Sequence, residues 1–263
     1  MIERALFVSS RLTPPGGFTD GIEGPACDAD GNLYVVNYVR QGTIGIVTPD
    51  GACALFVELP TGSIGNGIRF NAAGTMLVAD YTSHNVLAVN MQSRMVTVYA
   101  HEPCMNQPND LAISASGLVY ASDPNWREAT GQIWRVDTSR HITLLETGMG
   151  TTNGIEVSSD EQTLYVNETI QRTIWAYDLA PDGTLSRKRL LIRFDDYGLD
   201  GMRCDIDGNL YVTRWGKGTI AKVSPAGQVL CEIAVSGAKC TNLTFGGGRR
   251  TDMLRNCRRR GHS

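Results

Sequence analysis

Two stretches, Cys27-Asp-Ala-Asp-Gly-Asn-Leu-Tyr-Val-Val-Asn-Tyr38 and Cys204-Asp-Ile-Asp-Gly-Asn-Leu-Tyr-Val-Thr-Arg-Trp215, are near-copies of each other. Each combines a polar turn containing Asp and Gly with a following run of β-branched and aromatic residues, a pattern typical of a strand that leaves a hairpin. Looser copies lie between them, at Phe70–Tyr81, Ile113–Asp123 and Val157–Thr169. The chain is therefore built from a repeat of about 43 residues.

A second set of strand-like segments follows the copies, and most of its members lead into a turn. These segments are Ile44–Thr48, Val86–Asn90, Ile133–Asp137, Ile174–Leu179 and Ile220–Ser224. About four short strands per repeat, with no amphipathic helix pattern between them, are the signature of a β-propeller blade. Six such units account for the 263 residues. We therefore predict an all-β fold, a six-bladed β-propeller with four-stranded blades, as one domain over residues 1–263.

The two ends of the chain together provide the sixth unit. We expect the N-terminal run Ala5–Ser9 to complete the last blade and to close the ring, which removes exposed sheet edges. The C-terminal run from Gly246 contains six Arg and one Asp and does not alternate as a strand should. Residues 248–263 are therefore expected to be an atypical basic tail, disordered over its last eight residues, which would leave the sixth blade incomplete.

Composition excludes several classes of function. The chain is 42% hydrophobic and 19% charged, which excludes a disordered protein, and a net charge of −3 offers no broad basic face to nucleic acid. No run approaches the roughly 20 apolar residues of a membrane span, and the N-terminus lacks a signal-peptide core. We predict a cytoplasmic protein that binds neither nucleic acid nor membrane. The sequence leaves the oligomeric state open.

One position in every repeat carries a side-chain oxygen just before the first strand. Its occupants are Glu23, Asn66, Asn109, Asn153, Asp200 and Asn242. Since the first strand of each blade lines the central channel of a propeller, these residues should converge at one end of the axis. Such a ring of oxygen donors suits a hard divalent cation of the calcium type. The alternative is that the Asn-Gly and Asp-Gly pairs only form tight turns.

Residues about 15 positions further along should return to the same end of the channel, because the second strand of a hairpin is antiparallel to the first. They are Tyr38, Tyr81, Pro124, Glu168 and Trp215, with Trp126 close by. Aromatic side chains around a metal would form a pocket for a small organic ligand. The alternative is that these aromatics pack between blades.

Together these residues carry a resemblance to a known family. The motifs are Glu23-Gly24-Pro25, Gln107-Pro-Asn-Asp-Leu111, Asn153-Gly154-Ile155, Leu199-Asp200-Gly201-Met202 and Asn242-Leu-Thr-Phe-Gly-Gly247. They make the chain similar to the senescence marker protein, gluconolactonase and luciferin-regenerating-enzyme-like family of six-bladed propellers. The resemblance covers about residues 22–247. After Gly247 the family normally continues with a further strand, whereas this chain continues into Arg-rich sequence.

The resemblance implies a divalent metal held by Glu23, Asn153 and Asp200, with Asn109 as a fourth ligand or a substrate contact. Ca²⁺ is the expected ion, with Zn²⁺, Mn²⁺ or Mg²⁺ as alternatives. The resemblance also implies hydrolysis of a sugar lactone or related cyclic ester. Animal members that act on sugar lactones have Arg where this chain has Gln107, which leaves the particular lactone open.

The expected mechanism assigns a role to each group of residues. The metal would polarise the lactone carbonyl, and Asp200 would act as the general base toward water. The residues expected to bind the substrate are Tyr38, Asn66, Tyr81, Gln107, Trp126 and Trp215. Two other functions use the same residues, namely a non-enzymatic propeller that binds a metal and a ligand, and an organophosphate hydrolase.

Overall fold

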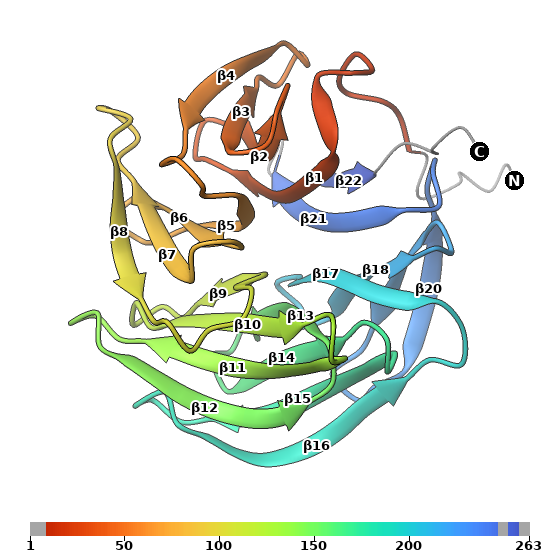
Figure 1. Cartoon of the computed structure of the whole chain (residues 1–263). Helices are drawn as coiled ribbons and strands as arrows, with labels where there is room; N and C mark the ends of the chain where they lie inside the picture. The colour runs from red at the N-terminus through yellow and green to blue at the C-terminus, as the bar shows by residue number, and fades with distance from the viewer. Residues whose placement is uncertain (1–8, 247–251, 258–263) are drawn as a thin grey trace, which may run out of the picture.

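The structure, a computed structural model, describes residues 9–246 and 252–257. Within those ranges it contains strands and no helix, arranged as sheets around a central axis (Figure 1). Five sheets have four strands each and a sixth has two, and strand order follows chain order within each sheet. The fold is a β-propeller, as predicted.

The five four-stranded sheets are five blades. Blade 1 comprises β1 (Phe18–Cys27), β2 (Leu33–Tyr38), β3 (Thr43–Val47) and β4 (Cys53–Glu58). Blade 2 comprises β5 (Gly65–Phe70), β6 (Met76–Asp80), β7 (Asn85–Val89) and β8 (Val96–His101). Blade 3 comprises β9 (Leu111–Ile113), β10 (Val119–Asn125), β11 (Thr130–Val136) and β12 (Ile142–Met149). Blade 4 comprises β13 (Thr152–Val157), β14 (Thr163–Glu168), β15 (Thr173–Leu179) and β16 (Leu185–Arg193). Blade 5 comprises β17 (Gly198–Cys204), β18 (Leu210–Trp215), β19 (Thr219–Val223) and β20 (Val229–Ala234).

The C-terminal region differs from the prediction. Strand β21 (Cys240–Gly246) pairs with β22 (Asp252–Cys257), with Phe245 opposite Met253 and Leu243 opposite Arg255. Part of the expected basic tail is therefore a strand, because Met253 and Leu254 pack against apolar residues of neighbouring strands. The sixth sheet has two strands in the described residues rather than four. Residues Ala5–Val8 of the expected closing strand, and the tail residues 247–251 and 258–263, lie outside the described ranges.

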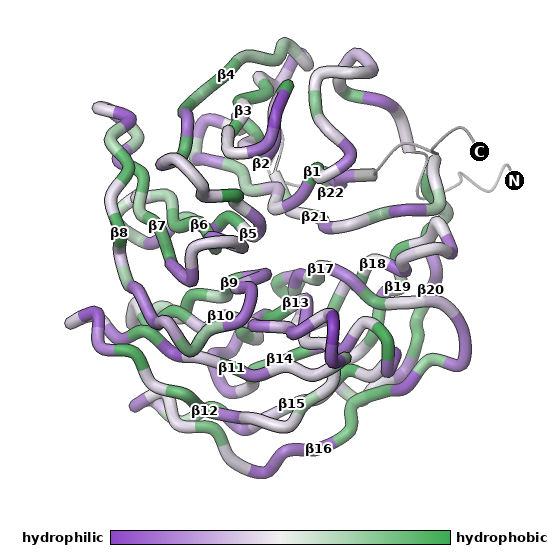
Figure 2. The backbone as a smooth tube through the Cα atoms, in the orientation of Figure 1, coloured by the Kyte–Doolittle hydropathy of each residue, from purple (hydrophilic) through white to green (hydrophobic). Residues whose placement is uncertain are grey.

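The six innermost strands contact one another in a closed ring. They meet in the order β1, β5, β9, β13, β17 and β21, and β21 in turn contacts β1. The apolar core lies between adjacent sheets: one cluster joins Val36 and Ile44 of blade 1 to Ile68 and Leu87 of blade 2, and equivalent clusters follow around the ring. Strands β6 and β7 are hydrophobic along most of their length, because both faces of their sheet pack against neighbouring sheets, whereas the outer strand β16 contains several hydrophilic residues (Figure 2).

The described part of the chain has no helix that is long and apolar enough to cross a membrane. Cytoplasmic location and the assignment of residues 1–263 to a single domain both stay predictions.

Candidate metal and substrate site

A cavity of about 400 Å³ lies where the inner strands begin. Five of the six residues expected to form the ring of oxygen donors line it, namely Glu23, Asn66, Asn109, Asn153 and Asp200. We call these five residues the oxygen ring. Each is at most 8% exposed, so the cavity wall holds them tightly. Residues from five blades thus meet in one place, and the first three of them are separated by 43 residues in the sequence.

Four of the five oxygen-ring residues lie at irregularities of the inner strands, and the fifth, Asn109, lies just before β9. The pairing of β5 with β6 skips from Gly65 to Ile68, around Asn66. It skips in the same way around Asn153 in β13 and around Asp200 in β17, and it shifts on both sides of Glu23 in β1. A β-bulge frees one residue from the regular ladder and redirects its side chain. The repeated bulge therefore explains why these side chains lie in the cavity rather than between blades.

Asn153 has the clearest sign of a missing partner. Its Nδ2 lies 3.0 Å from Thr169 Oγ1, whereas its Oδ1 is buried and has no hydrogen-bond partner among the described residues. A buried acceptor without a donor costs roughly 1–3 kcal/mol. Coordination of a cation would satisfy this oxygen.

The donor chemistry of the oxygen ring fits a hard cation. Glu23 and Asp200 contribute carboxylates, and Asn66, Asn109 and Asn153 contribute amides, the oxygen ligands that Ca²⁺ accepts. No group of three or more His, Cys, Asp or Glu within the described ranges could hold a metal. A metal at this position would therefore depend on amide oxygens as well as carboxylates.

Asn167 supports Asp200 from the neighbouring blade. The Asn167 Nδ2 donates a hydrogen bond of 2.5 Å to the backbone carbonyl of Asp200, and Asn167 is fully buried. A Cβ atom on Gly154 would approach both Asn167 Nδ2 and the Asp200 carbonyl oxygen to 2.6 Å. The glycine therefore leaves room for this bond, and the bond fixes the backbone from which the Asp200 carboxylate projects.

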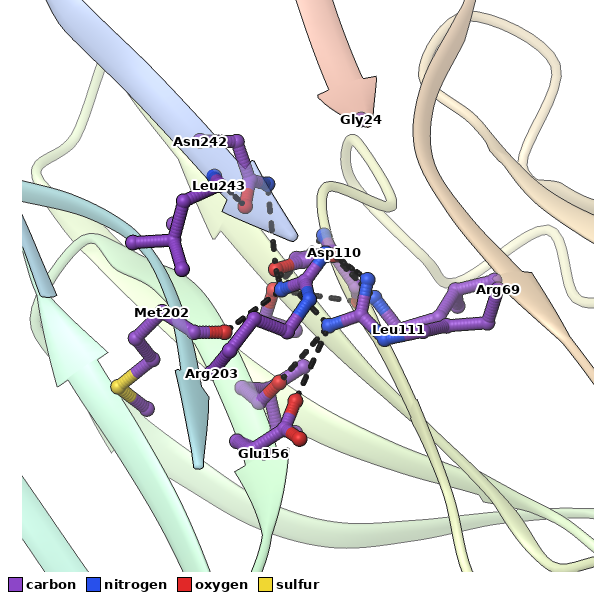
Figure 3. A network of polar contacts seen from close by, with 12 residues as sticks. Gly24, Arg69, Asp110, Leu111, Glu156, Met202, Arg203, Asn242 and Leu243 are labelled. Atoms are coloured by element: carbon purple, nitrogen blue, oxygen red, sulfur yellow. Dashed lines mark hydrogen bonds and ion pairs between the residues drawn. The ribbon is translucent and has the colours of Figure 1, made fainter. Parts of the chain in front are cut away.

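Asn242 does not line the cavity, contrary to the prediction. Its Nδ2 donates to Asp110 Oδ2 at 3.4 Å, and its Oδ1 accepts the N–H of Leu243 at 2.9 Å (Figure 3). The regular spacing correctly places Asn242 in the sixth inner strand. The Asn242 amide is hydrogen-bonded to the buried Asp110 carboxylate of blade 3 and so does not line the cavity. The spacing of the repeat does not predict this partner.

Below the oxygen ring lies a set of paired charges, Arg69, Asp110, Glu156 and Arg203, which we call the charge cluster (Figure 3). Arg69 binds Asp110 at 3.0 Å and Glu156 at 3.2 Å, and Arg203 binds Asp110 at 3.3 Å. Three members follow an oxygen-ring residue by three positions on the same strand, about 10 Å further along the axis. The cluster links blades 2, 3, 4 and 5 and has no formal net charge.

Burial and pairing act in opposite directions on these groups. Burial acts to raise the pKa of Asp110, but the guanidiniums of Arg69 and Arg203 outweigh it and hold that pKa below its usual range. Burial raises the pKa of Glu156, and the nearby Asp110 carboxylate adds to the effect. Burial and the adjacent Arg69 lower the pKa of Arg203 to about 10.

Three of the aromatic residues expected at the mouth are there. Tyr81, Trp126 and Trp215 all line the cavity, as expected for antiparallel second strands that return to the starting end. Tyr38 does not line it. Its ring packs edge-on against Phe18 with centroids 5.2 Å apart, a contact within blade 1 and not the contact between blades that was the alternative.

Gln107 is also outside the cavity lining. Its backbone N–H donates to the Asp123 carboxylate at 2.6 Å, which holds the segment leading to Asn109. Asp123 also accepts the N–H of Asn106 at 2.8 Å and the indole N–H of Trp134 at 2.9 Å. The prediction of Gln107 as a substrate contact therefore finds no support in its position.

Asp123 represents a repeated position that the sequence analysis missed. The residue 14 positions after each predicted ring residue is polar and buried in all six units, namely Asn37, Asp80, Asp123, Asn167, Arg214 and Asn256. Several clamp the loop that leads into an inner strand: Asp80 binds Ser63, and Arg214 binds the Asp196 carbonyl. A polar residue repeated directly before the expected aromatic position was the available signal.

Three further residues with polar side chains line the cavity and were not predicted. They are Asn37, Gln41 and Thr169, which come from segments that follow or end a second strand. Asn37 stands at the repeated buried polar position described above, whereas the alignment of the units gives no indication of Gln41 or Thr169.

Comparison with known proteins finds relatives that are named as lactonases. It is 28% identical over 260 residues to a protein named gluconolactonase from Zymomonas mobilis, covering 85% of this chain and 72% of that protein. It is 32% identical over 142 residues to pentonolactonase XacC from Haloferax volcanii, covering 53% of this chain and about half (49%) of that protein. Among solved structures, a calcium-binding protein, regucalcin, from Agrobacterium tumefaciens superposes with a TM-score of 0.81 at 21% identity, covering 94% of this chain and 85% of that one.

The family comparison covers most of the chain and agrees with the motifs around the cavity. Residues 22–254 match the family described as SMP-30/Gluconolactonase/LRE-like region, a span that includes every residue of the oxygen ring. The chain belongs to the SMP-30/gluconolactonase/LRE-like family.

Proposed function

We propose that the protein is a metal-dependent lactonase that opens a sugar lactone or a related cyclic ester. The observation that carries the proposal is the oxygen ring, whose two carboxylates and three amides converge on a cavity large enough for a small organic molecule. Support also comes from relatives whose names describe hydrolysis of gluconolactone and pentonolactone.

Glu23, Asn109, Asn153 and Asp200 would hold the cation, which we propose to be Ca²⁺. The unpartnered Asn153 Oδ1 supports this assignment, and so does the hard-oxygen character of the set. The calcium-binding regucalcin of similar fold is consistent with it. A bound divalent cation supplies a positive charge that stabilises the oxyanion formed when a lactone carbonyl is attacked.

Asp200 is the proposed general base. Its carboxylate lies in the cavity wall, and the bond from Asn167 to its backbone holds it in place, so it can accept the proton of an attacking water. Asn66, Tyr81, Trp126 and Trp215 would orient the lactone ring against this face of the cavity.

The test is metal-dependent turnover. Metal-free protein is given Ca²⁺, Zn²⁺, Mn²⁺ or Mg²⁺ separately, and acid release is followed with aldonolactones and simple γ- and δ-lactones, together with a thermal shift for each metal. We expect hydrolysis that requires a cation and falls by about a thousandfold in Asp200→Asn, because loss of a general base costs 10²–10⁴ in rate. Asp207→Asn, an exposed turn residue, is the matched control.

Near-normal turnover in Asp200→Asn would disprove the assignment of the base. A thermal shift with metal but no turnover on any lactone would favour an organophosphate hydrolase or a binding propeller. No response to any metal would mean that the oxygen ring forms turns only.

We also propose that β21 and β22 are the inner half of a sixth blade. Their support is the contact of β21 with both β17 and β1, which gives β21 the same place in the ring as the other five inner strands.

A further inference from the structure

The segment 37–42, which we call the rim loop, connects β2 to β3 at the edge of the cavity. Asn37 and Gln41 line the cavity, while Tyr38 between them packs away against Phe18. The rim loop thus presents two amide side chains to the space where the proposed substrate would lie. Both can form hydrogen bonds, and neither belongs to the oxygen ring.

The orientation of the Asn37 amide is determined by its surroundings. Its Nδ2 donates to the backbone carbonyl of Gly21 at 2.7 Å. Since a carbonyl oxygen only accepts, the amide nitrogen must face Gly21 and Oδ1 must point the other way. That Oδ1 is buried and has no hydrogen-bond partner among the described residues. A buried acceptor of this kind requires a donor that the protein itself does not provide.

The backbone of the rim loop is strained. Asn37 has φ 66° and Val39 has φ 60°, and a β-branched residue in this region is a true outlier. A hydrogen bond of 2.6 Å from the Arg40 N–H to the Tyr38 carbonyl closes a tight turn around Val39. Strain of this kind persists only where the surrounding structure enforces it, and it concentrates at ligand-binding sites.

Neighbouring groups enforce the strained conformation from several sides. The Thr43 hydroxyl lies 2.6 Å from the Tyr38 carbonyl and 2.8 Å from the Arg40 carbonyl, and Thr43 is buried. The Val39 N–H donates to the Gly17 carbonyl at 2.8 Å. The loop is therefore held rigidly, as an element that selects a ligand by hydrogen bonds requires.

We propose that Asn37 and Gln41 of the rim loop contact hydroxyl groups of the substrate and so favour hydroxylated over unsubstituted lactones. Asn37 Oδ1 accepts a hydrogen bond from one hydroxyl, and the Gln41 amide bonds another. A substrate without hydroxyl groups leaves the Asn37 acceptor unpaired, which is how a polar pocket rejects an apolar analogue. This inference rests on the proposed lactonase function and names two further residues that would contact its substrate.

The test compares two six-membered lactones, D-glucono-1,5-lactone and unsubstituted δ-valerolactone, on each enzyme preparation. We expect Gln41→Met and Asn37→Ala to lower kcat/KM for the gluconolactone about tenfold, through KM, and to leave δ-valerolactone within about twofold. Gln92→Met, at an exposed turn, is the control and should change neither. Partial unfolding of Asn37→Ala lowers both rates equally and leaves their ratio unchanged, so the ratio reports recognition alone. An unchanged ratio in both variants would overturn the proposal.

A second measurement separates this inference from the lactonase proposal. D-Glucitol has the hydroxyl groups but no lactone to hydrolyse, so its binding does not depend on turnover. We expect glucitol to raise the melting temperature of the wild type more than that of Gln41→Met, with general solvent effects cancelling between the two. If no lactone is hydrolysed but this difference is present, the lactonase proposal fails and the rim loop still binds polyols. Equal shifts in both proteins contradict the rim-loop proposal whatever the turnover.

Discussion

The oxygen ring and the charge cluster lie close together along the inner strands, with Arg69, Glu156 and Arg203 each three residues after a ring residue, and they have opposite properties. In the oxygen ring, Asn153 Oδ1 is buried and no described residue gives it a hydrogen bond, and the strands are bulged so that side chains enter a cavity. In the charge cluster, Arg69 and Arg203 neutralise Asp110, and Arg69 also binds Glu156. The difference indicates that one level of the channel is arranged to receive a ligand and the next level to hold the blades together.

The largest expected effect on stability comes from breaking the charge cluster. In Asp110→Asn the buried Arg203 guanidinium and the 13% exposed side chain of Arg69 lose their shared carboxylate, and removal of one partner of a buried ion pair costs about 3–5 kcal/mol. Urea unfolding of the metal-free protein measures this loss. Asp30→Asn, at an exposed turn, should change stability by less than about 0.5 kcal/mol. A loss below about 1 kcal/mol in Asp110→Asn would show that the cluster does not brace the blades.

Removal of a polar side chain from the oxygen ring should change stability little and should instead weaken binding of the cation. We expect the free energy of unfolding of Asn153→Ala to lie within about 1 kcal/mol of the wild-type value. The variant loses one hydrogen bond to Thr169 but also removes a buried acceptor that no described residue satisfies. Its affinity for Ca²⁺ should fall about tenfold or more, measured by calorimetry on metal-free protein. Unchanged affinity would exclude Asn153 as a ligand and would weaken the distinction between the two levels.

A smaller effect is expected one contact away from the oxygen ring. Thr169→Val removes the hydroxyl next to Asn153 Nδ2 but keeps the shape of the side chain. The Asn153 amide is then free to rotate, and we expect Ca²⁺ affinity to fall a few-fold, less than in Asn153→Ala. The comparison of the two variants by calorimetry is the measurement. A larger loss of Ca²⁺ affinity in Thr169→Val than in Asn153→Ala would indicate that Thr169 itself binds the cation.

The smallest effect concerns pH. Burial raises the pKa of Glu156 above its ordinary value of 4.5, so the folded state keeps this proton to a higher pH than the unfolded state does. The contribution of Glu156 to stability is therefore present at low pH and is lost as pH rises from 4.5 through the raised pKa. Glu156→Gln cannot titrate, so the difference between its unfolding free energy and that of the wild type should change across this interval. Urea unfolding at a series of pH values is the check, and a constant difference would contradict the prediction.

Much of the fold and of the candidate site follows from the repeat alone. The spacing near 43 residues brings Glu23, Asn66 and Asn109 to equivalent places, and the cavity contains all three. Hairpin geometry also correctly places Tyr81 and Trp215 at the same end. The departures are individual. Tyr38 packs against Phe18, and Asn242 donates a hydrogen bond to Asp110. Both contacts are with residues outside the repeat position, so the spacing does not predict them.

The sequence by itself determined the repeat, the all-β propeller and the level of the chain at which oxygen donors converge, because these depend on a period that is visible along the chain. Only the tertiary structure decided which of these polar side chains are paired within the protein and which can still bind a ligand. Arg69 meets Asp110 across 41 residues and Glu156 across 87, and Asn37 is turned by Gly21 so that its Oδ1 is left without a donor. The physical reason is that hydrogen-bond and charge pairing depend on distances across blades, and a one-dimensional pattern contains no record of those distances.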